Sequence, residues 1–296
     1  MAAQNMPAAE VDVTEDLVRR LLGEQHPDLA DRPLRLVANG WDNVIFRLGD
    51  DLSVRMPRRQ LAADLVVHEQ RWLPVLAERL PLVIPTPVRL GDATGGYPWR
   101  WSICPWLEGD VAADVALAAP GQEAERLGHF LATLHVAAPS DAPCNPYRGG
   151  PVIELSERFA PRVDQLDGLL DVATLLDHLD GLLDVQEWSG PAVWIHGDLH
   201  TANLLVADGT ISSVIDWGDV TSGDPACDFA IAWMLFDRPD RDRFRRAVGG
   251  VQPIDDATWQ RAEAWALHFA VMYLLHSADS GRFERMGTSL LAALLD

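Results

Sequence analysis

The chain has 296 residues, 48% of them hydrophobic and 23% charged, which is typical of globular proteins and excludes a disordered or fibrous one. Its formal net charge is −20 and it contains no Lys, so we expect a field that repels nucleic acid and anionic membranes and attracts Mg²⁺ and amine-bearing substrates. It has no membrane-length apolar run, no secretory leader and only three isolated cysteines, which favours a cytoplasmic protein without disulfides or structural zinc.

The N-terminal part predicts a small antiparallel sheet with one important helix. Apolar residues recur at helical spacing over residues 14–25. Residues 34–57 hold three β-prone runs separated by the turn sequences NGWDN and GDD, which predicts a meander. Helical periodicity returns over residues 60–80, where Pro74 should kink or divide the helix. After a Pro-rich connection, residues 97–107 resemble a further pair of strand segments.

The C-terminal part is expected to be mainly helical, because the composition becomes Ala-rich after residue 108. We therefore predict two lobes, a nucleotide-binding lobe over 1–108 and a catalytic lobe over 109–296, and an α+β fold class. Residues 122–138 form the clearest amphipathic helix, and the acidic, Leu-rich residues 164–184 also have a helical pattern. Of the net charge, about −17 falls after residue 108, because 12 Arg there face 29 acidic residues.

The residues that carry chemistry lie in WIHGDLHTANLLVADGTISSVIDWGD, residues 194–219. Asn203 follows Asp198 by five residues, and a short hairpin with a turn at Asp208-Gly209 then leads to Asp216. Phosphoryl transfer needs a carboxylate that accepts the proton of the attacking hydroxyl, and oxygen ligands for the Mg²⁺ that neutralises the phosphates. The protein-kinase catalytic loop has an Asp and an Asn at this spacing, followed by a metal-binding Asp.

The strings HGDLHTANLL and VIDWGD resemble the signature of the aminoglycoside phosphotransferase family, which has a protein-kinase-like fold and includes antibiotic kinases and metabolite kinases. The resemblance implies a bilobal fold, ATP or GTP as the phosphate donor, and Asp198 as the catalytic base. It also implies that Asn203 and Asp216 bind Mg²⁺ and that His196 supports the catalytic loop. In the string DPACDFA that follows, we interpret Asp228 as a brace for that loop.

The nucleotide side departs from the kinase pattern. A kinase holds the α- and β-phosphates with a Lys on the third strand, braced by a Glu on the next helix. Here the candidates are Arg55 and Glu69, because the chain has no Lys. The turn ANGWDN has one glycine, and the backbone amides from Gly40 to Asn43 are our candidates for covering the phosphates, with an ordinary hairpin turn as the alternative.

Residues 103–106 are the expected hinge, where the backbone of Cys104 and Trp106 would contact the nucleotide base. Pro105 has no N–H to donate, so the choice between ATP and GTP is open.

For the function we expect a kinase that phosphorylates a hydroxyl group of a cationic, aminoglycoside-like antibiotic or metabolite. Alternatives are a macrolide kinase, a metabolic kinase for a sugar, choline or homoserine, and an inactive nucleotide-binding pseudokinase. The missing Lys and the altered phosphate turn motivate the last of these.

Overall fold

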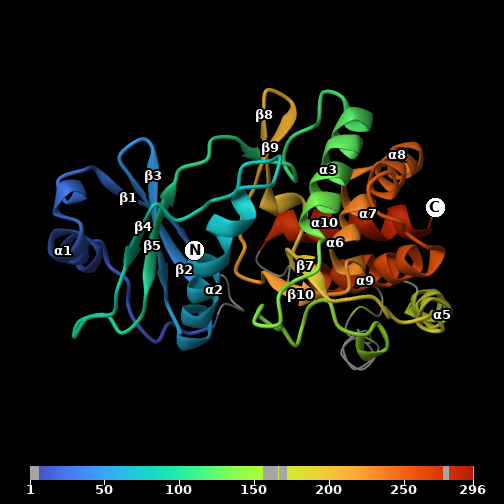
Figure 1. Ribbon diagram of the computed structural model, residues 1–296, viewed down its shortest axis with the longest axis horizontal. Coiled ribbons are helices and arrows are strands. Elements are labelled where there is room, and N and C mark those ends of the chain that lie inside the picture. Colours follow the sequence, from blue (N-terminus) through green and yellow to red (C-terminus); the bar gives the residue numbers. More distant parts are fainter. Residues whose placement is uncertain (1–6, 156–165, 167–171, 276–279, 296) are drawn as a thin grey trace. The chain divides into compact units, whose positions relative to one another are not determined.

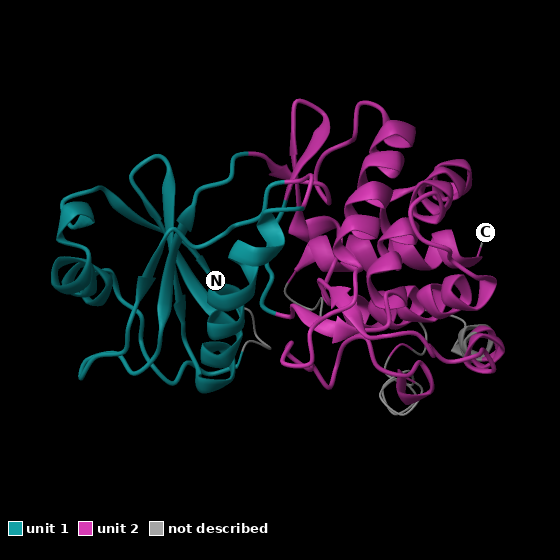
Figure 2. Ribbon diagram, in the orientation of Figure 1, with its two compact units in different colours: residues 1–79, 83–108, 214–218 teal, residues 80–82, 109–213, 219–296 magenta. Residues whose placement is uncertain are grey.

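The structure, a computed structural model, describes residues 7–155, 166, 172–275 and 280–295. The chain divides into two compact units, coloured separately in Figure 2. The first consists of residues 1–79, 83–108 and 214–218, and the second of residues 80–82, 109–213 and 219–296.

The sequence boundary after residue 108 is also a boundary between the units, but the segment 214–218 differs from the prediction. It belongs to the first unit, because the Val214 amide donates to the Val83 carbonyl at 3.0 Å and Trp217 is fully buried. A short stretch of the C-terminal half of the sequence is therefore part of the N-terminal unit.

The first unit is built on a five-stranded antiparallel sheet with the order β1-β2-β3-β5-β4 (Figure 1). Its strands are β1 (Leu34–Asn39), β2 (Asn43–Leu48), β3 (Leu52–Pro57), β4 (Arg89–Gly91) and β5 (Trp101–Pro105). The predicted meander over residues 34–57 is confirmed. The prediction of two strands within residues 97–107 is wrong, because Thr94 and Tyr97 bridge each other in a turn and β5 pairs with β4, which lies in the Pro-rich connection.

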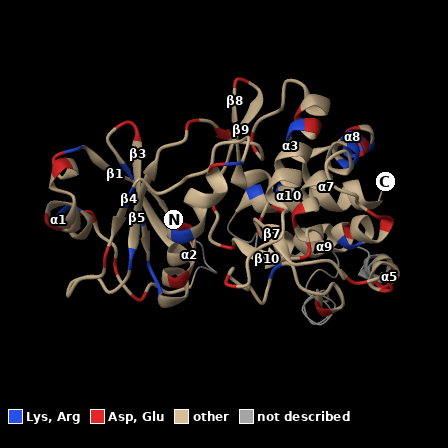
Figure 3. Cartoon of the chain, viewed as in Figure 1, with Lys and Arg blue, Asp and Glu red and all other residues tan. Residues whose placement is uncertain are grey.

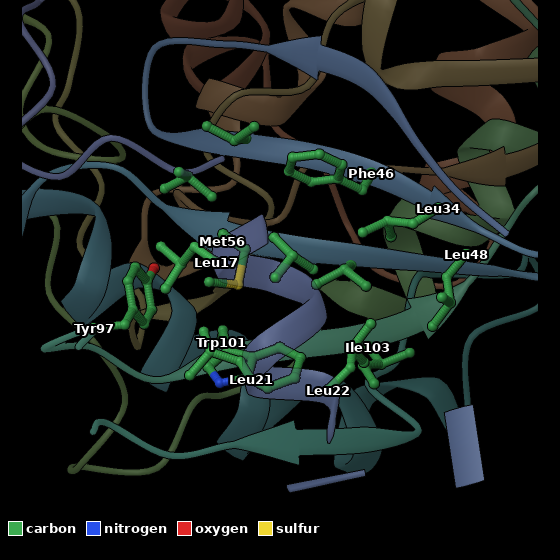
Figure 4. Packing of buried hydrophobic residues seen from close by; sticks show 14 of the residues in the cluster. Leu17, Leu21, Leu22, Leu34, Phe46, Leu48, Met56, Tyr97, Trp101 and Ile103 are labelled. Carbon is green, nitrogen blue, oxygen red and sulfur yellow. The ribbon is translucent and has the colours of Figure 1, made fainter. Parts of the chain in front are cut away.

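Helices α1 (Glu15–Gln25), η1 (Pro27–Leu29) and α2 (Gln60–Ala77) complete this unit. Figure 4 shows Leu17, Leu21 and Leu22 of α1 in one buried cluster with Phe46 and Trp101 of the sheet. Successive residues of a strand point to opposite faces of the sheet. On β3, Val54 and Met56 point into this core, so Arg55 between them lies on the opposite face, where the candidate site is found.

Helix α2 runs through Pro74 as one helix, so the division considered from the sequence does not occur. Leu73 and Leu76 are both buried, which anchors the helix on either side of the proline. The free energy gained by burying Leu73 and Leu76 therefore exceeds the cost of the backbone hydrogen bond that Pro74 cannot make.

The second unit is mainly helical. Its small sheets contain β6 (Asp110–Val111), β7 (Val193–Ile195), β8 (Leu204–Ala207), β9 (Thr210–Val214) and β10 (Thr221–Gly223). Its helices are α3 (Pro120–Leu134), α5 (Val172–Leu183), η3 (Thr201–Asn203), α6 (Ala226–Phe229), α7 (Ile231–Leu235), α8 (Arg238–Gly249), α9 (Asp256–Leu275) and α10 (Gly281–Leu295). The predicted α+β class is confirmed, with the sheet mostly in one unit and the helices mostly in the other.

Two helix predictions in this unit need adjustment. Helix α3 ends at Leu134 and not at residue 138, because Ala137 bridges to Val193 of β7 and leaves the helical path. Of the predicted helix over residues 164–184, α5 confirms the later part, while residues 164–165 and 167–171 lie outside the described residues. No described helix combines the length and the hydropathy needed to cross a bilayer.

Candidate active site

In the first unit, a buried ion pair lies on the face of the sheet opposite the α1 cluster. Arg55 on β3 places its Nη2 3.1 Å from Oε1 of Glu69 on α2, and the two side chains are only 8% and 3% exposed. The sequence predicts that these two residues pair, and the structure brings them together. Their contact is the one expected between the cation of the third strand and the carboxylate of the next helix.

Asp216 belongs to the same unit and adds a second carboxylate to this group. Its Oδ1 lies 3.5 Å from Nη2 of Arg55, while its side chain is 60% exposed. Its φ of 61° is a left-handed conformation that costs a non-glycine residue about 1–3 kcal/mol and is typical of functional sites. Trp217 stabilises this conformation, because the ring is buried and its Nε1 donates to the Val214 carbonyl at 2.9 Å.

The electrostatics of this group follow from burial and from the opposed charges. Burial favours a lower pKa for Arg55, but the carboxylates of Glu69 and Asp216 outweigh it and raise that pKa above its ordinary value. Burial raises the pKa of Glu69 to about 7, although Arg55 opposes the shift. Arg55 is therefore a permanent cation.

The turn at Gly40 to Asn43 is held by the protein itself. The Gly40 amide donates to the Asn43 carbonyl at 2.9 Å, and Arg58 donates to the Gly40 carbonyl at 3.0 Å. A Cβ on Gly40 would meet only an ordinary contact at 3.5 Å, so the turn does not require glycine at this position. The Gly40 amide is thus already engaged, whereas Oδ1 of Asn43 is buried without a hydrogen-bond partner among the described residues.

The expected hinge continues β5. Cys104 is buried opposite Ser53 of β3, and the Trp106 amide donates to the Asp51 carbonyl at 2.8 Å. The Arg47 guanidinium lies over the Trp106 ring, 4.5 Å from its centroid. Because the Trp106 amide is used within the unit, any contact of Trp106 with a base would have to involve another of its groups.

In the second unit, β7 leads directly into His196-Gly197-Asp198, the predicted catalytic loop. Gly197 has a φ of 86°, and a Cβ there would lie 2.6 Å from the Asp219 carbonyl oxygen, so this position requires glycine. Asp228 accepts hydrogen bonds from the His196 amide at 2.8 Å and the Gly197 amide at 2.9 Å. The predicted role of Asp228 as a brace for the loop is confirmed.

Asp198 is held at both its backbone and its side chain. Its amide donates to Nδ1 of His196 at 3.2 Å, and its Oδ1 accepts from Nη2 of Arg148 at 2.9 Å. Nε2 of His200 lies 3.5 Å from Oδ2. Nδ1 of His200 accepts from the Ala202 amide, so Nε2 carries the ring proton and can face the carboxylate.

The protonation state of Asp198 is decided by a competition. Burial favours a higher pKa, but the positive charge of Arg148 and the hydrogen bond from His200 outweigh it and hold the pKa of the carboxyl well below its usual range. Asp198 is therefore ionised at neutral pH and can accept a proton.

Asn203 lies on η3, close to Asp198. Its Nδ2 donates to the Asp198 carbonyl at 2.9 Å, which fixes the amide and leaves Oδ1 as its remaining acceptor. No cluster of three or more His, Cys, Asp or Glu residues suited to a metal occurs in the part of the chain that the structure describes. The Oδ1 atom of Asn203 is an oxygen ligand of the kind that Mg²⁺ accepts, and Mg²⁺ commonly takes one or two protein oxygens and completes its shell with phosphates and water.

Arg148 and Asp219 are the residues near Asp198 that sequence analysis missed. Arg148 lies in the loop between α3 and α5, fifty positions before Asp198, and no spacing rule connects them. Asp219 lies 3.6 Å from the same guanidinium. The one available signal was an Arg directly before Gly149-Gly150 in a strongly acidic part of the chain.

A cavity of about 340 Å³ opens in the second unit beside the catalytic loop. Thr201 lines it, and so does Tyr273, whose ring meets the His200 ring edge-on with centroids 5.7 Å apart. Most of the residues that line it are apolar and come from residues 112–120 and from α7, but polar atoms contribute about half of its surface. Among the described residues, the one charged group in the lining is Arg285.

Comparison with known proteins places these features in a family. The sequence model of the phosphotransferase enzyme family matches residues 33–265. A search of curated proteins gave no match.

Several solved structures resemble the chain over nearly its whole length. The GDP complex of aminoglycoside 2'-phosphotransferase-IIIa is 20% identical with a TM-score of 0.72, covering 96% of this chain and 99% of that one. Macrolide 2'-phosphotransferase MphH from Brachybacterium faecium is 22% identical with a TM-score of 0.63, covering 93% and 97%. ADP-bound aminoglycoside phosphotransferase APH(2'')-Ib is 16% identical with a TM-score of 0.61, covering 95% and 97%. The predicted kinase-like fold is thereby confirmed.

Proposed function

The chain belongs to the phosphotransferase enzyme family, and from this premise we propose that it transfers the γ-phosphate of ATP or GTP to a hydroxyl group of a small molecule. The observation that carries the proposal is the setting of Asp198, an ionised carboxylate fixed by His196, Arg148 and the catalytic loop. As the general base, Asp198 would orient the acceptor hydroxyl and take its proton during transfer. His196 would act through the backbone, by supporting the loop.

On the nucleotide side, Arg55 braced by Glu69 is our candidate for holding the α- and β-phosphates. The buried ion pair supports this role, because Arg55 keeps its charge and its position before any ligand binds. The turn at Gly40 and Asn43 would cover the phosphates through groups other than the engaged Gly40 amide. The backbone of Cys104 and the backbone carbonyl of Trp106, whose amide is engaged by Asp51, are our candidates for contact with the base.

For the metal, Asn203 would contribute its Oδ1 and Asp216 its exposed carboxylate. Mg²⁺, when bound, neutralises negative charge on the phosphates as transfer proceeds. The free acceptor atom of Asn203 and the strained, exposed Asp216 support these assignments. We place the reaction in the cytoplasm, where nucleotide and Mg²⁺ are both available.

Two acceptor classes compete, a polycationic aminoglycoside and a macrolide. The acidity of the C-terminal part favours any acceptor that carries an amine. The cavity beside the catalytic loop is lined by apolar residues and polar atoms in similar measure, and its Arg285 is paired with Asp114 at 3.3 Å, so this lining is compatible with either class.

The test is an acceptor screen with purified protein, Mg²⁺ and either ATP or GTP, in which release of nucleoside diphosphate is coupled to a spectrophotometric readout. The panel holds kanamycin, gentamicin, streptomycin, erythromycin, choline, homoserine and simple sugars. We expect turnover that depends on a hydroxylated, amine-bearing acceptor of this panel. Nucleotide binding without turnover on any acceptor would instead favour a pseudokinase.

Two variants test the assigned roles. Asp198→Ala should abolish turnover and leave nucleotide affinity nearly unchanged, because the base does not bind the nucleotide. Asp216→Ala should weaken nucleotide binding only when Mg²⁺ is present. Turnover in Asp198→Ala, or an unaltered Mg²⁺ dependence in Asp216→Ala, would contradict the respective assignment.

A further inference from the structure

The contact between Arg148 and Asp198 points to a role for a residue outside the family motif. We infer that Arg148 is a positioning residue that fixes the Asp198 carboxylate in one orientation for the acceptor hydroxyl. The inference rests on the proposed function of Asp198 as the base. All the residues that carry it belong to the second unit.

The Arg148 guanidinium is restrained on several sides. Its Nη2 lies 2.9 Å from Oδ1 of Asp198 and 3.6 Å from Oδ2 of Asp219, so it joins two carboxylates. Its Cζ lies 5.5 Å from the centroid of the Phe269 ring on α9, within the range of a cation–π contact. A planar cation held between two anions and an aromatic ring has few other orientations.

The backbone that carries Arg148 is also fixed. Gly149 has a φ of 65°, and a Cβ there would lie 2.5 Å from Cδ1 of Ile195, so the loop packs closely against β7. The Asp224 amide donates to the Gly149 carbonyl at 2.9 Å. Asn145 anchors the partner carboxylate, because its Nδ2 donates to Oδ1 of Asp219 at 2.6 Å. Hydrogen bonds therefore fix the loop on both sides of Arg148, through Asn145 before it and Gly149 after it.

The effect on Asp198 follows from the freedom of a carboxylate. The last torsion of an Asp side chain is broad, so an unrestrained carboxylate rotates. Here Oδ1 faces Arg148 and Oδ2 faces Nε2 of His200, which opposes rotation from both sides. A near-attack geometry depends on such restraint, and a small misplacement of a reacting group costs about 100-fold in rate.

A purely structural role would predict a different environment. The Arg261–Asp224 pair of the same unit is an example of one, since its side chains are 2% and 4% exposed. The side chains of Arg148 and Asp198 are 21% and 27% exposed, so this pair is in contact with solvent. The Arg148–Asp198 pair thus lies at the solvent-accessible end of the catalytic loop, whereas the Arg261–Asp224 pair lies in the core.

The experiment measures kcat and KM for nucleotide and acceptor in the wild type and in Arg148→Ala, Arg148→Lys and the control Arg126→Ala. Each assay contains Mg²⁺ and either ATP or GTP, with kanamycin or erythromycin as the acceptor. If the wild type phosphorylates neither acceptor, the rate of nucleotide hydrolysis by water is measured instead. Arg126 is a matched control, because it also joins a carboxylate, that of Glu123, and a backbone carbonyl, that of Ile211, in the second unit.

We expect Arg148→Ala to lower kcat about 100-fold with little change in either KM. Arg148→Lys should fall between the wild type and Arg148→Ala, because the charge stays but the planar fork is lost. Added guanidinium at millimolar concentration should restore part of the Arg148→Ala rate, and methylammonium should restore less. Arg126→Ala should keep the wild-type kcat.

Other outcomes overturn the inference. A raised acceptor KM with unchanged kcat would make Arg148 a substrate ligand. Equal losses in both Arg148 variants, with lowered melting temperature and no rescue, would make it a structural residue. The proposed function is judged separately by Asp198→Ala: if that variant is inactive while Arg148→Ala is fully active, only the inference about Arg148 fails.

Discussion

At the scale of single residues, the Arg55–Glu69 pair shows how a site can be built without Lys. An ammonium is a compact charge on a flexible stem, whereas the Arg55 guanidinium is a longer planar fork. The protein accommodates it by burying the fork against Glu69 on α2, with Asp216 at 3.5 Å on the other side. The position of the cation is therefore set by two carboxylates from different parts of the sequence.

The raised pKa of Glu69 predicts a pH-dependent contribution to stability. The folded-state pKa is about 7, above the ordinary value of 4.5, so the folded protein binds this proton more tightly than the unfolded chain does. The contribution is fully present below pH 4.5 and is lost as the pH rises through 7. Its magnitude is on the order of 3 kcal/mol.

The measurement is urea unfolding of the wild type and Glu69→Gln at a series of pH values. We expect the free energy of unfolding of the wild type, relative to that of Glu69→Gln, to decrease between pH 4.5 and pH 7. A difference that does not vary over this range would show that Glu69 keeps its ordinary pKa.

At the scale of elements, the contact between α3 and α8 depends on one glycine. A Cβ added to Gly128 of α3 would lie 2.8 Å from Cβ of Ala247 and 2.9 Å from the Phe244 carbonyl oxygen of α8. Both distances are too short for a relaxed contact, so the two helices approach at a separation that only glycine allows.

Gly128→Ala should therefore force the helices apart and lower the free energy of unfolding by about 1–3 kcal/mol. Gly249→Ala is the matched control, because Gly249 lies in α8 and a Cβ there would meet nothing within 4 Å. Alanine has the higher helix propensity, so this control should be neutral or stabilising by up to about 1 kcal/mol. Equal effects of the two substitutions on urea unfolding would contradict the packing argument.

At the scale of the whole molecule, charge is the dominant feature. The formal net charge is −20, and Arg supplies all 24 basic residues other than His. Figure 3 shows Arg interspersed with Asp on α8, whereas the sequence of α5 contains Asp and no Arg. A net charge this far from zero favours solubility but opposes compaction through self-repulsion.

We expect added NaCl to stabilise the protein. At about 0.1 M salt the screening length is near 10 Å, so repulsion among separated surface carboxylates is weakened while buried pairs such as Arg55–Glu69 are little affected. Urea is the suitable denaturant because it is uncharged. A free energy of unfolding that decreases with NaCl would mean that surface ion pairs outweigh the net repulsion.

The sequence alone determined the local elements and the chemistry-bearing motif. The meander, α2 and the Asp208-Gly209 hairpin follow from periodicity and turn chemistry, which act over a few residues. The spacing of Asp198, Asn203 and Asp216 identified the reaction class for the same reason, since a catalytic loop is a short, contiguous segment.

Tertiary structure alone decided what surrounds that motif. The placement of Asp216 in the first unit, the pairing of β5 with β3 and the contact of Arg148 with Asp198 all join residues far apart in the chain. Such contacts depend on tertiary packing and on whether the attraction between charges exceeds the cost of burying them. Local sequence preferences reflect neither of these, because they act over a few neighbouring residues.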